Sequence, residues 1–155
     1  PFYLSWKAKE YNTEAKFIEL AGEVNRKMTE NITHRIARGL NDYKKSVKDS
    51  NIMIVGVAYK KDIDDVRESP ALRIMESLKY KGANVCYHDP YVKTVKSLKN
   101  TELTKDNLEK QDAIVITTDH TNVDYDLLAK HSKLIVDTRN RMATVKNPKA
   151  SIIRA

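Results

Sequence analysis

Apolar residues recur every three or four positions between residues 13 and 47 of this 155-residue chain. They are Phe17, Leu20, Val24, Met28, Ile32, Ile36, Leu40, Tyr43 and Val47. This spacing predicts one amphipathic helix about 50 Å long, with Asn12–Thr13 as its N-cap. A small sheet domain cannot cover such a helix, so we expect part of the stripe to meet another domain or chain. The alternative is a shorter helix that breaks near Gly39–Leu40.

The pattern changes after a polar connector at Lys48–Asn51. Short apolar runs predict strands at Ile52–Val57, Asn84–Tyr87, Ala113–Thr117 and Leu134–Asp137, with an edge strand at Ser151–Arg154. Helices are predicted at Pro70–Tyr80, Val92–Lys99, Leu103–Lys110 and Asp124–Lys130. Strands joined by helices imply a parallel sheet. We therefore predict an α/β fold: a long N-terminal helix followed by a doubly wound, mainly parallel, Rossmann-like sheet.

The first predicted strand passes through Gly56 and a polar loop, Tyr59–Glu68, into a helix that begins with Ser69–Pro70. The loop's cations are Lys60, Lys61 and Arg67, and its acids are Asp62, Asp64, Asp65 and Glu68. A dinucleotide fingerprint would need three glycines here, and only one is present. The loop therefore favours phosphate binding by cationic side chains at the ligand-binding edge of the sheet. The alternative is that these cations pair with the neighbouring acids in a solvated loop.

Composition narrows the function classes. A net charge of +7 favours an anionic partner or a solvated basic surface. The alternative outside the nucleotide class is a nucleic-acid-binding module that uses the basic helix Arg26–Lys48, but aromatic residues are not interleaved with the basic ones. The lone cysteine, Cys86, excludes a disulfide framework and fits a reducing cytoplasm. No apolar run is long enough for a membrane span, and a start at Pro1 suggests a fragment.

Other polar residues invite less specific interpretations. Asp89 follows the second strand, where it could meet a ribose, but stabilising the turn before Pro90 is the favoured role. Thr117–Asp119 end the third strand and could line a pocket. Cys86 lies within an apolar strand and is interpreted as core. The histidines His34, His88, His120 and His131 lack metal-ligand spacing and are interpreted as surface or turn residues, so we predict no metal site. A response-regulator receiver is disfavoured, because no acidic pair directly follows the first strand.

Four motifs resemble the UDP-glucose/GDP-mannose dehydrogenase family. They are GVAYKKDIDDVRESPAL at residues 56–72, PFYLSWKAKEY at residues 1–11, YHDP at Tyr87–Pro90 and VDTRN at Val136–Asn140. The opening PFYL resembles the branch that acts on UDP-N-acetylhexosamines more than the UDP-glucose branch. The resemblance covers essentially the whole chain. It implies a central dimerisation helix region at residues 1–47 and a C-terminal nucleotide-sugar (UDP)-binding domain at residues 48–155.

The resemblance also implies roles for individual residues. Lys60 would contact the diphosphate of the nucleotide sugar, and Tyr59 would pack near the bound substrate. Arg139, from the VDTRN motif, would help to hold the nucleotide. Arg67 would reach the NAD held by another domain. The aspartates Asp64–Asp65 would orient the loop, since like charge repels phosphate.

The family oxidises the C6 alcohol of the sugar twice, using two NAD and a thioester on a cysteine that would precede Pro1. The implied parent is an NAD-dependent nucleotide-sugar 6-dehydrogenase for surface-polysaccharide synthesis, acting on a UDP-N-acetylhexosamine, with UDP-glucose or GDP-mannose as alternatives. Without the NAD domain and that cysteine, this chain would bind the UDP-sugar and form a homodimer through the long helix, but be inactive alone. Cys86 on a core strand cannot replace an activated thiolate, so we assign no catalytic residue.

Overall fold

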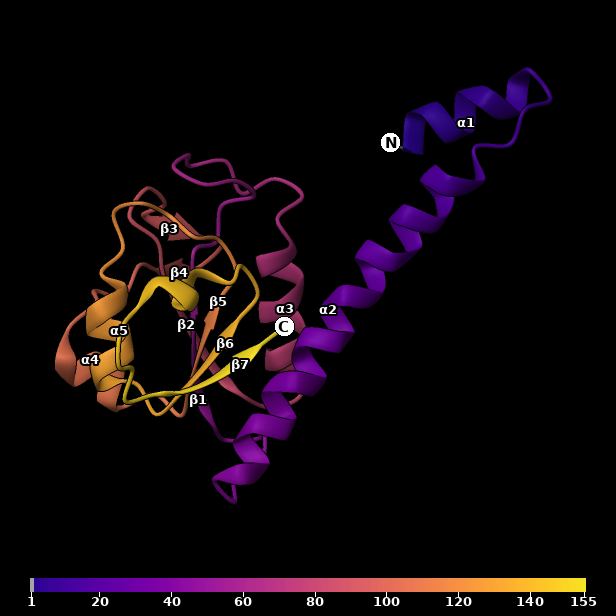
Figure 1. Ribbon diagram of the computed structural model, residues 1–155. Coiled ribbons are helices and arrows are strands. Elements are labelled where there is room, and N and C mark those ends of the chain that lie inside the picture. Colours follow the sequence, from indigo (N-terminus) through magenta and orange to yellow (C-terminus); the bar gives the residue numbers. More distant parts are fainter. Residues whose placement is uncertain (1) are drawn as a thin grey trace.

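The computed structural model describes residues 2–155. Pro1, the first residue of the PFYLSWKAKEY stretch, lies outside the described residues. Figure 1 shows a compact α/β unit and one long helix that runs along its side and extends well beyond it. A short helix, α1 (Phe2–Glu10), folds back at the far end of the long helix, α2 (Lys16–Asp42). No helix in the described part of the chain is long and apolar enough to cross a membrane.

The central sheet has five parallel strands in the order β2-β1-β5-β6-β7. They are β1 (Asn51–Val55), β2 (Asn84–His88), β5 (Ala113–Ile116), β6 (Leu134–Asp137) and β7 (Ser151–Arg154). Ile52 pairs with Val85 of β2 on one side and with Ala113 of β5 on the other, so the chain winds outward from β1 in both directions. The predicted doubly wound, parallel sheet is therefore confirmed, and all five strands end at the same edge.

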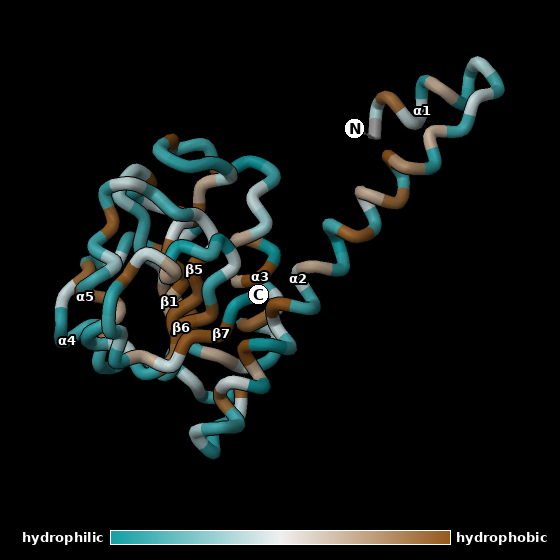
Figure 2. The backbone as a smooth tube through the Cα atoms, viewed as in Figure 1, coloured by the Kyte–Doolittle hydropathy of each residue, from teal (hydrophilic) through white to brown (hydrophobic). Residues whose placement is uncertain are grey.

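Each face of the sheet has its own hydrophobic core. Ile52 and Ile54 face α2 and α3 (Pro70–Tyr80), whereas Met53 and Val55 face α4 (Lys105–Glu109) and α5 (Tyr125–His131). Buried apolar side chains on both faces explain why these strands are continuous hydrophobic runs rather than alternating ones. Figure 2 shows these runs as the hydrophobic centre of the α/β unit.

Local capping signals set the ends of α3, α4 and α5. The Ser69 hydroxyl accepts a hydrogen bond from the Ala71 N–H at 3.3 Å, and Pro70 occupies the first turn of α3. After the helix, Gly82 adopts a φ of +84°, which a side chain would disfavour. Thr104 and Asp124 likewise accept hydrogen bonds from the first turns of α4 and α5.

Two predictions about secondary structure are wrong. Residues 92–99 do not form a helix but a small antiparallel pair, β3 (Thr94–Val95) and β4 (Leu98–Lys99). Lys96 turns the chain there with a φ of +51°, a conformation that no helix contains. The long helix is shorter at both ends than the predicted residues 13–47, because it begins after Ala15 rather than at the Asn12–Thr13 cap and ends at Asp42. It continues through Gly39–Leu40, so the alternative of a break at that point is not observed. A short 3₁₀ helix, η1 (Arg141–Thr144), follows β6.

The two halves of α2 have different surroundings. Ile32, Ile36 and Leu40 are buried against the sheet and α3, whereas the outer half leaves Phe17 89% and Leu20 56% exposed. A Cβ atom at Gly39 would lie 2.6 Å from Ile153 Cδ1, so the inner half approaches its own sheet as closely as a glycine permits. The expectation that a small sheet domain cannot cover the whole stripe is confirmed.

Candidate functional site

A cleft of about 410 Å³ opens at the carboxyl edge of the sheet, between the middle of α2 and the loops that follow β1 and β6. Its lining includes Tyr59, Arg73, Thr117, Thr138 and Arg139. This volume lies within the range of small-molecule sites, and the carboxyl edge is where doubly wound sheets bind ligands. The cleft is therefore the candidate functional site.

The structure brings two of the four predicted site residues into this cleft. Tyr59 and Arg139 both line it, although 80 residues separate them in the sequence. Lys60 lies beside the cleft, with its Nζ atom 5.0 Å from the centre of the Tyr59 ring. Arg67 is 87% exposed and pairs with Asp65 instead of lining the cleft. The binding roles of these four residues stay predictions.

Asp65 orders the loop that carries these side chains. Its carboxylate accepts hydrogen bonds from Arg67 Nε and from Arg67 NH2, at 3.0 and 2.7 Å, and its carbonyl accepts one from the Tyr59 N–H. The hydrogen bonds from the Arg67 guanidinium lower the pKa of Asp65 to about 2. The prediction that an aspartate orients the loop is confirmed for Asp65. The alternative of pairing within the loop holds for Arg67, whereas Lys60 and Lys61 have no ion pair within residues 2–155.

Arg139 is placed by the two strands whose ends flank it. Asp137, buried at the end of β6, accepts a hydrogen bond from the Arg139 N–H at 3.0 Å. Asp119, after β5, lies 3.3 Å from Arg139 Nε. The backbone N–H and Nε of Arg139 are therefore held, while its side chain stays about half exposed at the mouth of the cleft. Such a planar fork suits a phosphate or carboxylate oxygen pair.

Sequence reasoning missed Arg73, which lines the cleft from the first turns of α3. This arginine makes no ion pair with any other residue that the structure describes. It lies beside the N-terminus of α3, whose partial positive charge also favours an anion. Glu68 is the acidic residue of the lining. The sequence did contain a signal for it: Arg73 follows the predicted cap, Ser69, by four residues, which places a cation at the ligand-binding edge of the sheet.

Asp89, at the end of β2, confirms the favoured interpretation of a turn aspartate. Its Oδ1 accepts hydrogen bonds from the N–H groups of Tyr91 and Val92 at 2.9 and 3.1 Å. The side chain is completely buried, so it does not face a ribose. Burial alone would raise the pKa of Asp89, but hydrogen bonds from His120 and from the N–H groups of Tyr91 and Val57 outweigh it and lower this pKa.

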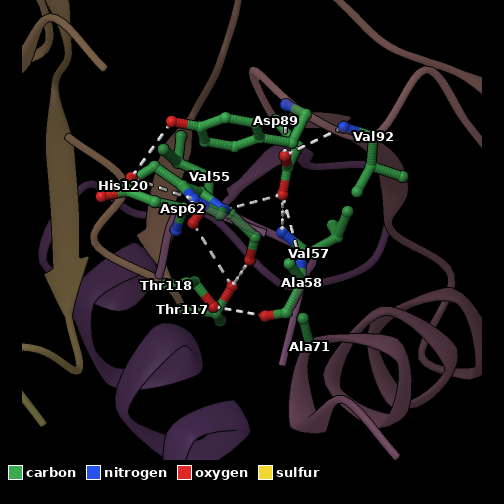
Figure 3. A network of polar contacts seen from close by, with 12 residues as sticks. Val55, Val57, Ala58, Asp62, Ala71, Asp89, Val92, Thr117, Thr118 and His120 are labelled. Carbon is green, nitrogen blue, oxygen red and sulfur yellow. Dashed lines mark hydrogen bonds and ion pairs between the residues drawn. The ribbon is translucent and has the colours of Figure 1, made fainter. Parts of the chain in front are cut away.

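His120 corrects the interpretation of the histidines as surface or turn residues. Its side chain is completely buried beside Asp89, with Nε2 3.0 Å from Asp89 Oδ2 (Figure 3). On its other side, Nδ1 accepts a hydrogen bond from the Asp62 N–H at 2.9 Å. Local pattern could not reveal this burial, because both partners are distant in the sequence. No group of acids, histidines and cysteines in the described residues could hold a metal ion.

Comparison with known proteins gives a consistent result. Residues 53–144 match the UDP-binding domain of the UDP-glucose/GDP-mannose dehydrogenase family. The UDP-N-acetyl-D-mannosamine dehydrogenase of Pyrococcus horikoshii is 32% identical over 99% of this chain and 35% of its own length. That of Methanococcus vannielii is 30% identical over 87% of this chain and 33% of its own length. This chain therefore spans about a third of the curated relatives it matches.

Solved structures share the fold. The structure of the UDP-D-ManNAc dehydrogenase from Pyrococcus horikoshii aligns with a TM-score of 0.76 at 28% identity, covering 95% of this chain and 34% of that one. A GDP-mannose dehydrogenase from Pseudomonas aeruginosa aligns with a TM-score of 0.74, covering 97% of this chain and 36% of that one. At 18% identity, this second likeness concerns the fold alone.

Proposed function

Because this chain belongs to the UDP-glucose/GDP-mannose dehydrogenase family, we propose that it is the UDP-sugar-binding part of an NAD-dependent nucleotide-sugar 6-dehydrogenase. The proposed substrate of the whole enzyme is a UDP-N-acetylhexosamine, oxidised at its C6 alcohol to the uronate with two NAD. The observation that carries this proposal is the shared cleft of Tyr59 and Arg139. Both residues lie within the segment that matches the UDP-binding domain.

The cleft supplies the chemistry that a nucleoside diphosphate needs. We assign to Arg139 a forked contact with the nucleotide and to Lys60 a point-charge contact with the diphosphate. Tyr59 is 42% exposed beside Lys60, and its ring offers a flat apolar surface against the bound substrate. Arg73 and the N-terminus of α3 add positive potential to the same cleft.

The proposed contribution of this chain is binding and orientation, not the redox step itself. NAD, held by the rest of the enzyme, would accept the hydride, and Arg67 would contact it. Arg67 is exposed, so it can exchange its pairing with Asp65 for a phosphate of the cofactor. Burial raises the pKa of the Cys86 thiol, which therefore resists forming the thiolate that covalent catalysis requires.

Calorimetric titration tests the binding proposal directly. We expect UDP-N-acetyl-D-mannosamine and UDP to bind the isolated chain, with NAD binding weakly or not at all. Arg139→Ala should weaken UDP binding about tenfold, because a charge-assisted contact is lost. The matched control is Arg38→Ala, which removes the same charge from an exposed position on α2. Binding of NAD in place of UDP, or equal effects of the two variants, would contradict the assignment.

We also propose a homodimer through the long helix. The outer half of α2 exposes a continuous apolar set: Phe17, Leu20, Val24 and Met28. Soluble monomers rarely leave large contiguous apolar patches exposed, and such patches mark association surfaces. Sedimentation velocity at increasing protein concentration should show a monomer–dimer equilibrium. A single monomeric species at high concentration would contradict this proposal.

A further inference from the structure

The loop between β1 and α3 carries three of the four predicted site residues and is held in a strained conformation. Asp62 and Glu68 have φ values of +60° and +59°, in the left-handed region that residues with a side chain seldom adopt. Such conformations persist where surrounding contacts impose them. The contacts at Asp62 therefore help to place Tyr59 and Lys60, together with the hydrogen bond that the Tyr59 N–H donates to the Asp65 carbonyl at 2.9 Å.

Two adjacent residues after β5 hold Asp62. His120 Nδ1 accepts a hydrogen bond from the Asp62 N–H at 2.9 Å. The Asp62 carboxylate accepts two hydrogen bonds from Thr121, one from its N–H and one from its hydroxyl, both at 2.7 Å. The backbone and the side chain of Asp62 are thus attached to the same short segment.

The His120 ring is itself fixed from behind. Because Nδ1 accepts from a backbone N–H, the ring carries its proton on Nε2 and donates it to Asp89 Oδ2, 3.0 Å away. The same Asp89 oxygen accepts hydrogen bonds from the N–H groups of Val57 and Ala58, at 2.7 and 3.2 Å. Figure 3 shows Asp89 between His120 and these two residues.

Asp89 and His120 therefore hold the loop on both sides of its functional residues. Asp89 anchors Val57 and Ala58 directly before Tyr59, and His120 anchors Asp62 directly after Lys60 and Lys61. All of the intervening loop residues are exposed. Nothing else described in the structure attaches the Asp62 backbone N–H.

We propose that His120 is a positioning residue for the ligand site: its hydrogen bond to the Asp62 N–H sets the place of Tyr59 and Lys60 beside the cleft, and thereby the affinity for the diphosphate of a UDP-sugar. The ligand in this proposal rests on the proposed function. A purely structural His120–Asp89 pair, which only stabilises the domain, is the competing explanation.

Two amide variants separate the two hydrogen bonds of the ring. The side-chain oxygen of His120→Asn can occupy the position of Nδ1 and accept from Asp62, but its amide does not reach Asp89. The longer side chain of His120→Gln places its amide at the position of Nε2, where it donates to Asp89 and leaves Asp62 without its acceptor. His131→Gln is the matched control for affinity, because His131 lies 3.3 Å from Glu109 on α4 and does not line the cleft.

Titration with UDP measures the effect of each variant on affinity, and urea unfolding measures its effect on stability. We expect His120→Gln to keep most of the stability but to weaken UDP binding about tenfold, the effect of losing one ordering hydrogen bond. His120→Asn should lose more stability and less affinity, and His131→Gln should leave UDP binding unchanged. Affinity that falls in parallel with stability across the variants, or unchanged affinity in His120→Gln, would overturn the proposal.

Amide hydrogen exchange of Asp62 provides a readout that needs no ligand. Its N–H should exchange at least about tenfold faster in His120→Gln than in His120→Asn. If wild-type protein failed to bind UDP, the proposed function would be wrong, but the exchange rate of the Asp62 N–H would still test whether His120 positions the loop. Equal exchange rates in the two variants would overturn that positioning role. If a His120 variant does not fold, Thr121→Ala is the substitute, because Thr121 is exposed. It removes the hydrogen bond from the Thr121 hydroxyl to the Asp62 carboxylate and should likewise weaken UDP binding. Unchanged binding would overturn the proposal.

Discussion

The inner and outer halves of α2 carry the same apolar periodicity and have opposite surroundings. On the inner half, Ile36 and Leu40 are completely buried against the sheet. On the outer half, Phe17 is 89% exposed, although it continues the same stripe. Periodicity therefore identifies which face of a helix is apolar. It does not identify whether that face is covered by the same chain or by another one.

The polar contacts of the two halves of α2 differ in the same way as their burial. The inner half is tied to distant strands: Arg35 donates to the Arg154 carbonyl at 2.8 Å, and Tyr43, at its end, donates to the Lys133 carbonyl at 3.0 Å. The outer half has ion pairs such as Lys9–Glu19, at 2.8 Å, whose partners are both exposed. Exposed pairs contribute little to stability. The contribution of α2 to the stability of the fold therefore comes mainly from its inner half.

The largest expected effect is the removal of a buried side chain from the inner half. Ile36→Ala should lower the free energy of unfolding by about 3 kcal/mol, from lost apolar burial and the cavity that remains. Leu20→Ala, at an outer position that is 56% exposed, should lower it by less than about 1 kcal/mol. Urea unfolding of the two variants at low protein concentration measures the difference. Equal losses would mean that the outer half is also packed within the monomer.

Adding side-chain volume at a glycine should destabilise the inner half of α2 much more than the outer half. At Gly39, a new Cβ would meet Ile153 Cδ1 at 2.6 Å and Leu134 Cδ2 at 2.8 Å. Gly39→Val should therefore destabilise the fold by about 2 kcal/mol through overpacking. Gly22→Val, on the outer half, should change stability by less than about 0.5 kcal/mol, following helix propensity alone. A neutral Gly39→Val in thermal unfolding would show that the sheet yields at this contact.

Elements with local signals at both ends could be predicted from sequence. The helix Pro70–Tyr80 was predicted with the bounds that the structure has, because Ser69–Pro70 starts it and Lys81–Gly82 stops it. Strands Leu134–Asp137 and Ser151–Arg154 were also placed correctly. Residues 92–99 were not, because their apolar spacing resembles a helix while Lys96 takes a positive φ that no local motif announces.

The candidate site was only partly predictable for a related reason. Motifs located Tyr59 and Arg139 on loops that parallel topology brings to one edge, and the structure places both in one cleft. His120 was misjudged, because its burial depends on Asp89 and Asp62, which lie 31 and 58 residues away. Arg73 was missed, because it lies on helix α3 and not in the charged loop Tyr59–Glu68 that carries the motif residues.

Acid should weaken the anchor just beyond the inner end of α2. There, Asp112 lies 2.6 Å from Lys45 Nζ and accepts a hydrogen bond from the Asn51 N–H at 3.0 Å. Burial alone would raise the pKa of Asp112, but the hydrogen bonds from Lys45 and Asn51 outweigh it and lower this pKa. The contribution of this carboxylate is therefore complete above the unfolded-state pKa of about 4 and is lost as the pH falls through the lower folded-state value.

Asp112→Asn is the variant that isolates this contribution. It should destabilise the protein by about 1 kcal/mol at neutral pH, since it removes a charge-assisted hydrogen bond whose lysine is half exposed. The difference from wild type should begin to shrink as the pH falls below about 4, where Asp112 of the unfolded chain becomes protonated, and should be lost as the pH falls through the lower folded-state pKa. Urea unfolding across this pH range measures it. A difference that stays constant with pH would show that the charge of Asp112 is not what anchors the helix end.

The smallest effect on monomer stability is expected at Phe17, where the change in association should be greatest. Phe17→Glu places a charge at a residue that is 89% exposed, so the free energy of unfolding of the monomer should change by less than about 0.5 kcal/mol. If the outer half of α2 forms the proposed dimer, the same charge must be buried at that interface without a partner, which is costly. Sedimentation should then show the variant as a monomer at concentrations where wild type dimerises. Met28→Glu, nearer the sheet and 39% exposed, extends the test toward the covered half. Dimerisation that survives both charges would place the subunit contact elsewhere and leave the outer stripe to be covered by another domain.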